Sequence, residues 1–167
     1  MSNLSVHHSS DKDYWETPSK IYNPLDNEFN FYLDAAASEE NHKCADYYTE
    51  SHDSLNQDWY QHFSIFVNPP YGRGLKYWIK KASDEAEMGC TVVMLIPNRP
   101  TKAWFDYIYE RVDGDYSYGG ELRKGVELRP LEKRIVFEID GKPVLDKKGK
   151  PMPAPFPSSI VIFRGDE

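Results

Sequence analysis

The stretch HFSIFVNPPYGRGLKYWIKKASDEAEMGCTVVMLIP, residues 62–97, decides the fold. It begins with His62–Val67, an aromatic and β-branched run that predicts a strand, which the prolines after Asn68 end. Leu75–Met88 carries apolar residues at helical spacing and predicts an amphipathic helix. Thr91–Ile96 is almost entirely apolar, as expected for a strand buried on both faces of a parallel sheet. Together these segments predict a βαβ unit with a right-handed crossover.

The flanking segments extend this unit into one α/β domain. Phe31–Asp34 predicts a short strand that ends at Asp34, and Ala35–Cys44 is expected to form a helical turn. Pro100 and Thr101 open a second predicted helix. Three further strands are predicted, joined by glycine- and proline-rich turns: Val126–Leu131, Arg134–Ile139 and Ser159–Phe163. We therefore expect a mostly parallel sheet that ends in an antiparallel C-terminal hairpin.

Length and composition limit the possible classes of protein. The chain has 167 residues, which suits a single domain, and residues 1–13 are polar and expected to be flexible. It contains no apolar stretch long enough to span a membrane, and its first residues do not resemble a secretory signal. Two cysteines and five histidines show no metal-ligand spacing. We expect a cytoplasmic protein without a metal and without membrane association.

Charge is distributed unevenly along the chain. The net charge is −7, with −9 in residues 1–60, zero in residues 61–120 and +2 in residues 121–167. This asymmetry favours an acidic part that avoids phosphates and a later part that can contact them. Simple solvation of the surface explains the count equally well.

The motif Asn68-Pro69-Pro70-Tyr71 follows a predicted buried strand, where α/β sheets bind ligands. An exocyclic amine on a purine is a poor nucleophile because its lone pair conjugates with the ring. The side-chain oxygen of Asn68 and the carbonyl of Pro69 can each accept a hydrogen bond from one N–H group of this amine, and Pro70 fixes the backbone at this point. Tyr71 can stack on an extruded base, a contact worth ~1–3 kcal/mol. The alternative is a rigid turn with an aromatic lid.

Further motifs occur in the order of a known family. They are Trp15-Glu16-Thr17-Pro18, Phe31–Ser38, Asp53-Ser54-Leu55, Leu95–Arg99, Arg134–Phe137 and Ala154–Ser158. With the Asn-Pro-Pro-Tyr motif, the chain from about Tyr14 to Arg164 resembles the phage DNA N-6-adenine methyltransferases, a Dam-like family of class I methyltransferases. The resemblance implies a single Rossmann-like methyltransferase domain over residues 14–167, with S-adenosylmethionine as methyl donor and adenine N6 in DNA as acceptor.

The resemblance also implies roles for individual residues. Those expected at the cofactor are Trp15, Thr17, Pro18, Asp34, Ala35, Asp53 and Asn68, with Thr17-Pro18 near the methionine carboxylate, Asp34 near the amino group and Asp53 towards the adenosine end. The usual glycine-rich turn is replaced by Asp34-Ala35-Ala36-Ala37-Ser38. Four cations are candidates for DNA contact. Arg73 and Lys76 follow the motif, where they contact a phosphate or only solvate the start of a helix, and Arg99 follows a strand, which favours DNA contact over a surface ion pair. Arg134 is the fourth candidate, and the alternative for it is an ion pair with Glu132 or Glu138.

Two other functions stay open at this point. The same tetrapeptide serves methylation of RNA bases and of glutamine amides in proteins, because both acceptors share the planar nitrogen. A catalytically inactive acidic decoy is the alternative from another class, since residues 1–60 are strongly acidic. Asp34 and Asn68 lie only 34 positions apart, so we expect an abbreviated sheet there, no separate recognition domain, and a monomer that acts in the host cytoplasm if a phage encodes it.

Overall fold

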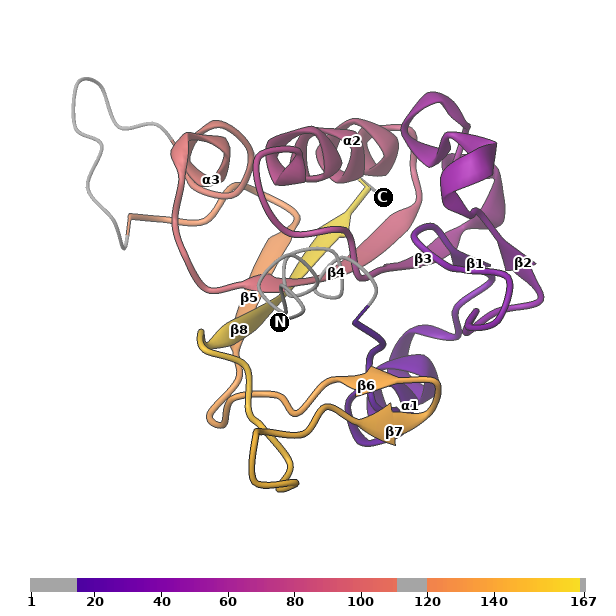
Figure 1. The fold of residues 1–167 in the computed structure, drawn as a ribbon. Helices are drawn as coiled ribbons and strands as arrows, with labels where there is room; N and C mark the ends of the chain where they lie inside the picture. The colour runs from indigo at the N-terminus through magenta and orange to yellow at the C-terminus, as the bar shows by residue number, and fades with distance from the viewer. Residues whose placement is uncertain (1–14, 111–119, 166–167) are drawn as a thin grey trace.

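The structure is a computed structural model that describes residues 15–110 and 120–165. A six-stranded sheet crosses the molecule in the order β2-β1-β3-β4-β8-β5 (Figure 1). Its first four strands are parallel, whereas β8 runs antiparallel to both β4 and β5. The strands are β1 Leu33–Asp34, β2 Asp46–Tyr47, β3 Ser64–Val67, β4 Thr91–Pro97, β5 Val126–Pro130 and β8 Ser158–Arg164. The predicted mixture of parallel and antiparallel strands is confirmed.

The βαβ unit of the quoted stretch is also confirmed. β3 is followed by α2, Leu75–Glu87, and then by β4, which pairs with β3 in parallel. The helix buries Ile79, Ala82 and Ala86 because its apolar residues recur on one face. The next helix, α3, spans Lys102–Tyr107 and follows β4 as predicted.

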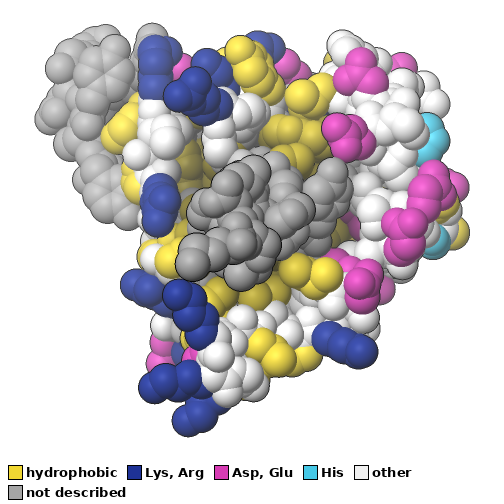
Figure 2. All heavy atoms as spheres, in the orientation of Figure 1, with side chains coloured by type: hydrophobic (Ala, Val, Ile, Leu, Met, Phe, Trp, Pro, Cys, Tyr) yellow, Lys and Arg dark blue, Asp and Glu magenta, His cyan; other side chains and the backbone are white. Residues whose placement is uncertain are grey.

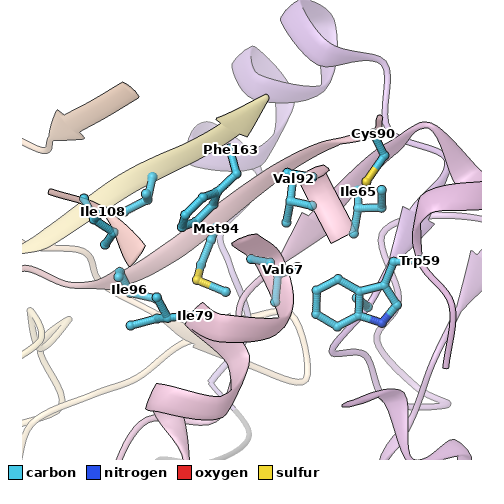
Figure 3. Packing of buried hydrophobic residues seen from close by; sticks show 14 of the residues in the cluster. Trp59, Ile65, Val67, Ile79, Cys90, Val92, Met94, Ile96, Ile108 and Phe163 are labelled. Atoms are coloured by element: carbon cyan, nitrogen blue, oxygen red, sulfur yellow. The ribbon is translucent and has the colours of Figure 1, made fainter. Parts of the chain in front are cut away.

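The sheet is covered on both faces. α2 and α3 lie on one face, while α1, Ser19–Phe29, and the small strands β6 and β7 lie on the other (Figure 1). Under α2 and α3 the core includes Trp59, Val67, Met94, Ile96 and Phe163 (Figure 3). On the α1 face Tyr22, Leu25, Phe66, Leu95 and Ile160 form a second cluster. Alternate residues of β3, β4 and β8 enter opposite clusters, which explains why these strands are apolar throughout.

Three expectations about single elements are corrected. Residues 35–44 form turns and bends rather than a helical turn. Of the predicted strand Arg134–Ile139, only Glu138–Ile139 forms a strand, β6, and its partner is β7, Lys142–Pro143, in a separate two-stranded sheet. The antiparallel pair at the edge of the main sheet is β5 with β8; residues 131–157 lie between these two strands, so the pair is not a hairpin.

The segment between β1 and β3 contains little regular structure. It holds β2 and three short 3-10 helices, η2 Glu50–His52, η3 Ser54–Asn56 and η4 Tyr60–His62. Helix α1 was not predicted. The predicted flexible segment, residues 1–13, lies outside the described residues.

Candidate active site

The parallel strands β1, β3 and β4 end along one edge of the sheet, where a ligand is expected. A cavity of about 910 Å³ lies beside the ends of β1 and β3. Five of the predicted site residues line it, namely Trp15, Ala35, Asp53, Asn68 and Pro70. The others in its wall include Glu16, Ala36, Ala37, Ser38, Glu39, Glu40, Asn41, Tyr48, Thr49, Glu50, Ser51, Ser54, Leu55, Trp78, Ile139 and Asp140.

The side-chain amide of Asn68 is held at both ends. Its Nδ2 donates to the carbonyl oxygen of Trp15 at 3.0 Å, and its Oδ1 accepts from the hydroxyl of Tyr71 at 2.8 Å. These two bonds fix which end of the amide is the oxygen. A carbonyl oxygen has two lone pairs, so Oδ1 retains the capacity to accept one further hydrogen bond.

The ring of Tyr71 packs against two other aromatic rings. Phe137 and Phe156 meet its ring edge-on, at centroid distances of 6.2 and 5.6 Å. Burial raises the pKa of the Tyr71 phenol above its ordinary value, so the hydroxyl remains a hydrogen-bond donor at neutral pH. Its oxygen also lies 3.3 Å from the carbonyl of Leu95 in β4. Within the motif itself, Pro69 is buried and Pro70 is exposed on the cavity wall.

Trp15 connects the motif to the small sheet. Its ring stacks on Phe137 at 5.1 Å and on Phe156 at 6.4 Å. The next residue, Glu16, exchanges backbone hydrogen bonds with Glu138 of β6. The chain segment before α1 therefore forms part of the site, far in sequence from the residues that it supports.

Thr17 and Pro18 are buried next to this segment and do not line the cavity. The hydroxyl oxygen of Thr17 is buried and has no hydrogen-bond partner among the described residues. Pro18 is the N-cap residue of α1, and its carbonyl accepts the N–H groups of Ile21 and Tyr22. A buried hydroxyl without a partner is unfavourable unless a ligand or water satisfies it.

The carboxylate of Asp34 faces the following loop rather than the cavity. It accepts the backbone N–H of Lys43 at 2.9 Å and that of Ala36 at 3.3 Å. Burial raises the pKa of Asp34 to about 6, although these hydrogen bonds act in the opposite direction. Asp34 therefore shapes the loop whose residues form one wall of the cavity.

The backbone of this loop is fully engaged within the protein. The N–H groups of Ala35, Ala37 and Ser38 bond to the carbonyls of Phe66, Tyr48 and Asn41, and that of Ala36 bonds to Asp34. None of Ala35–Ser38 has a positive φ. Glycine is therefore not required at these positions, which explains how the loop can dispense with the usual glycines.

Carboxylates line much of the cavity. Asp53 is among them, with a left-handed backbone at φ 52° and Oδ2 bonded to the Asn56 amide at 2.6 Å. The other acidic residues in the wall are Glu16, Glu39, Glu40, Glu50 and Asp140, none of which sequence reasoning singled out. Such a wall favours a positively charged ligand and disfavours a phosphate.

Comparison with known proteins identifies the family. The family model for DNA N-6-adenine-methyltransferase (Dam) matches residues 4–160, most of the chain. The chain belongs to the Dam family. This confirms the membership that the motifs predicted.

Two relatives in the Dam family come from phages. A DNA N-6-adenine-methyltransferase of Escherichia phage T1 is 36% identical over 95 residues, which cover 56% of this chain and 40% of the phage protein. One of Haemophilus phage HP1 is 34% identical over 99 residues, which cover 58% of this chain and 57% of its own length. The putative methyltransferase YfdM of Escherichia coli K12 is 37% identical over 65 residues, 35% of this chain and 71% of the bacterial protein. The matched region thus spans about half the length of the two phage relatives.

The cations predicted to contact DNA lie in different surroundings in this Dam-family chain. The guanidinium of Arg99 lies 5.3 Å from the ring centroid of Phe156, one ring away from Tyr71. All four, Arg73, Lys76, Arg99 and Arg134, are exposed. Of these, Lys76 lies over the ring of Tyr77 at 5.1 Å.

Sequence reasoning did not assign roles to Phe137 and Phe156. Both belong to the motifs that carry the resemblance, and their spacing from aromatic partners could not be read from the sequence. Within residues 15–110 and 120–165, no three His, Cys, Asp or Glu side chains gather as a possible metal site. In the same part of the chain, no helix is long and apolar enough to cross a membrane.

Proposed function

We propose that this Dam-family chain transfers a methyl group from S-adenosylmethionine to the N6 amine of adenine in DNA. The observation that carries the proposal is the oriented amide of Asn68, which Trp15 and Tyr71 hold beside the cavity at the end of β3. The names of the phage relatives support the same activity.

The residues around the cavity fit the proposed cofactor. S-adenosylmethionine supplies a methyl group on a positively charged sulfur and also carries an ammonium group. A carboxylate such as that of Glu50 suits these charges, Asp53 is proposed to face the adenosine end, and Trp15 offers an aromatic wall. Thr17 and Pro18 are proposed to support the methionine carboxylate from behind the cavity wall, since both are buried next to Trp15 and neither lines the cavity. We propose that Asp34 acts on the cofactor through the loop that it shapes, together with Ala35.

The acceptor side follows from the motif. The Asn68 oxygen and the Pro69 carbonyl each accept a hydrogen bond from one N–H group of the adenine amine. These bonds favour a tetrahedral nitrogen with a free lone pair. Pro70 limits the backbone at this point, and the ring of Tyr71 supports the extruded base. The methylated nitrogen then releases a proton to water, so no general base is assigned.

Several finer features belong to this proposal. The short β2 and the 3-10 helices between β1 and β3 support an abbreviated methyltransferase sheet. Arg73, Lys76, Arg99 and Arg134 are proposed to contact DNA. The domain boundaries, the monomeric state and the cytoplasmic location stay predictions from the sequence.

The test is a methylation assay with a labelled donor. The purified chain is offered unmethylated duplex DNA, RNA and a glutamine-containing protein in parallel, and the DNA is digested to nucleosides. We expect label in N6-methyladenine. Asn68→Ala should lower turnover by roughly a hundredfold with little change in cofactor affinity, because the lost interaction strengthens in the transition state. Asn27→Ala on α1 is the control. Label confined to RNA or protein would refute the proposal.

A further inference from the structure

Residues 145–152, which we call the lysine turn, form a closed and preformed turn. Backbone bonds join the Asp146 N–H to the Lys150 carbonyl at 2.7 Å and the Gly149 N–H to the Asp146 carbonyl at 3.0 Å. The Asp146 Oδ1 accepts the N–H groups of Lys148 and Lys150 at 2.8 and 2.9 Å. Gly149 has a φ of +76°, which glycine adopts without strain. The turn therefore has its shape before any partner binds.

The side chains of the lysine turn combine positive charge with apolar surface. The three lysines are exposed, and the only carboxylate among them is bonded to backbone N–H groups. On either side, Leu145 is 52% exposed and Met152 is 37% exposed. Cations interspersed with apolar side chains suit a polyanion whose backbone charges alternate with apolar sugar edges.

The lysine turn is fixed relative to the candidate active site. The N–H of Val144 bonds to the carbonyl of Phe137 at 2.9 Å, and the N–H of Ala154 bonds to that of Ile135 at 2.7 Å. Phe137 in turn packs against Tyr71 and Trp15. A polyanion bound at the lysine turn is therefore held at a defined distance from the Asn-Pro-Pro-Tyr motif.

The wider distribution of charge favours this side of the molecule for DNA. The chain has a net charge of −7, and six of its acidic residues lie in the cavity wall. On the face shown in Figure 2, Asp and Glu are concentrated on the flank of β1 and β2, whereas Lys and Arg are concentrated on the opposite flank, from α3 to the loops below β8. DNA must therefore bind through a local basic surface, because the protein as a whole repels it.

We propose that the lysine turn docks duplex DNA beside the target adenine. Lys147, Lys148 and Lys150 contact phosphates, while Leu145 and Met152 contact the sugar edges. The turn fixes the position of the duplex and does not read its sequence. This inference rests on the proposed function, since it names a surface that binds the same substrate.

The first experiment compares wild type with the triple variant K147A/K148A/K150A. Binding of a fluorescent duplex is followed by anisotropy over a series of salt concentrations. Each lost phosphate contact lowers the slope of log K against log salt by about 0.9, so we expect a decrease of about 2 to 3. KM for DNA should rise, while kcat at saturating DNA and the affinity for S-adenosylmethionine stay within about twofold. The control is K20A/K80A, which removes exposed lysines of α1 and α2.

A second variant separates the shape of the turn from its charge. Asp146→Ala removes the two side-chain hydrogen bonds within the turn, keeps its two backbone bonds, and removes one negative charge from the protein. We expect weaker DNA binding, whereas tighter binding would overturn the claim that the preformed turn matters. An unchanged salt slope and KM in the triple variant would overturn the docking surface while leaving methylation by the wild type intact. If the wild type methylates no adenine, the proposed function fails, and anisotropy still decides whether the turn binds DNA.

Discussion

The hydroxyl of Tyr71 provides the sharpest test of how the site is organised. Tyr71→Phe keeps the ring and its edge contacts with Phe137 and Phe156 but removes the 2.8 Å bond to Asn68. The Asn68 amide then keeps only its bond to the carbonyl of Trp15. A residue that only stacks on the base should tolerate this change, whereas a residue that orients the amide should not.

The expected magnitude follows from this one bond. A hydrogen bond between uncharged groups contributes about 0.5–1.5 kcal/mol net. Because a tenfold change in rate corresponds to about 1.4 kcal/mol, loss of the whole contribution lowers kcat roughly two- to tenfold. KM for DNA should change little, since the ring that we propose to stack on the base is still present. Tyr71→Ala should instead weaken base binding, by ~1–3 kcal/mol.

The assay is steady-state methylation of duplex DNA with kcat and KM measured separately, together with the thermal unfolding midpoint. Tyr32→Phe is the matched control, because Tyr32 is 55% exposed and precedes β1 at the opposite edge of the sheet. An unchanged kcat for Tyr71→Phe would refute an orienting role. So would a rise in KM that matches the fall in kcat, since that pattern indicates a general disturbance of the site.

Two further predictions concern stability. The raised pKa of Asp34, about 6, means that the folded chain binds this proton more tightly than the unfolded chain. The resulting stabilisation is fully present below about pH 4 and is lost as pH rises through 6, about 3 kcal/mol in all. Urea unfolding at several pH values should show this loss relative to Asp34→Asn, and parallel pH curves would contradict it. Gly125→Ala should lower the unfolding free energy by ~1–3 kcal/mol, because φ is +78° and the added Cβ would lie 2.7 Å from the Arg164 carbonyl oxygen. Gly74→Ala, where the Cβ meets nothing within 4 Å, is the control, and equal losses in the two variants would refute this reasoning.

Local patterns predicted the centre of the fold correctly. α2 and β4 could be read from the sequence because periodicity and a continuous apolar run depend on residues close together in the chain. The position of Asn68 at the ligand-binding edge followed from topology, since α/β sheets bind ligands beyond the carboxyl ends of their strands, whereas that of Ala35 came from the resemblance to the family. None of these features depends on contacts between distant segments of the chain.

Helix α1 and the fate of residues 134–139 depended on contacts between distant segments. Pro24 lies inside α1 and argues against a helix, yet Tyr22 packs on Phe66 of β3, and Glu28 forms a two-pronged ion pair with Arg129 of β5. The apolar residues of 134–139 fit a strand in any sheet. Burial of Ile135 and Phe137 in the cluster beneath α1 places the segment there instead. Sequence patterns predict which residues are buried, but they do not predict against which part of the fold these residues pack.

The loop after β1 forms one wall of the cavity without the glycine-rich turn that is usual in methyltransferases. A glycine-rich turn binds a ligand through backbone N–H groups that point outward, which requires an unobstructed backbone. Here the four N–H groups of Ala35–Ser38 all bond within the protein, so this loop contributes surface and not donors. Recognition of a ligand must then come from side chains, and the wall supplies carboxylates such as Glu50 and Asp53. The alanines and the acidic composition of residues 1–60 are thus two parts of one arrangement, in which carboxylate acceptors suited to a cationic ligand line the cavity and the loop offers it no backbone donors.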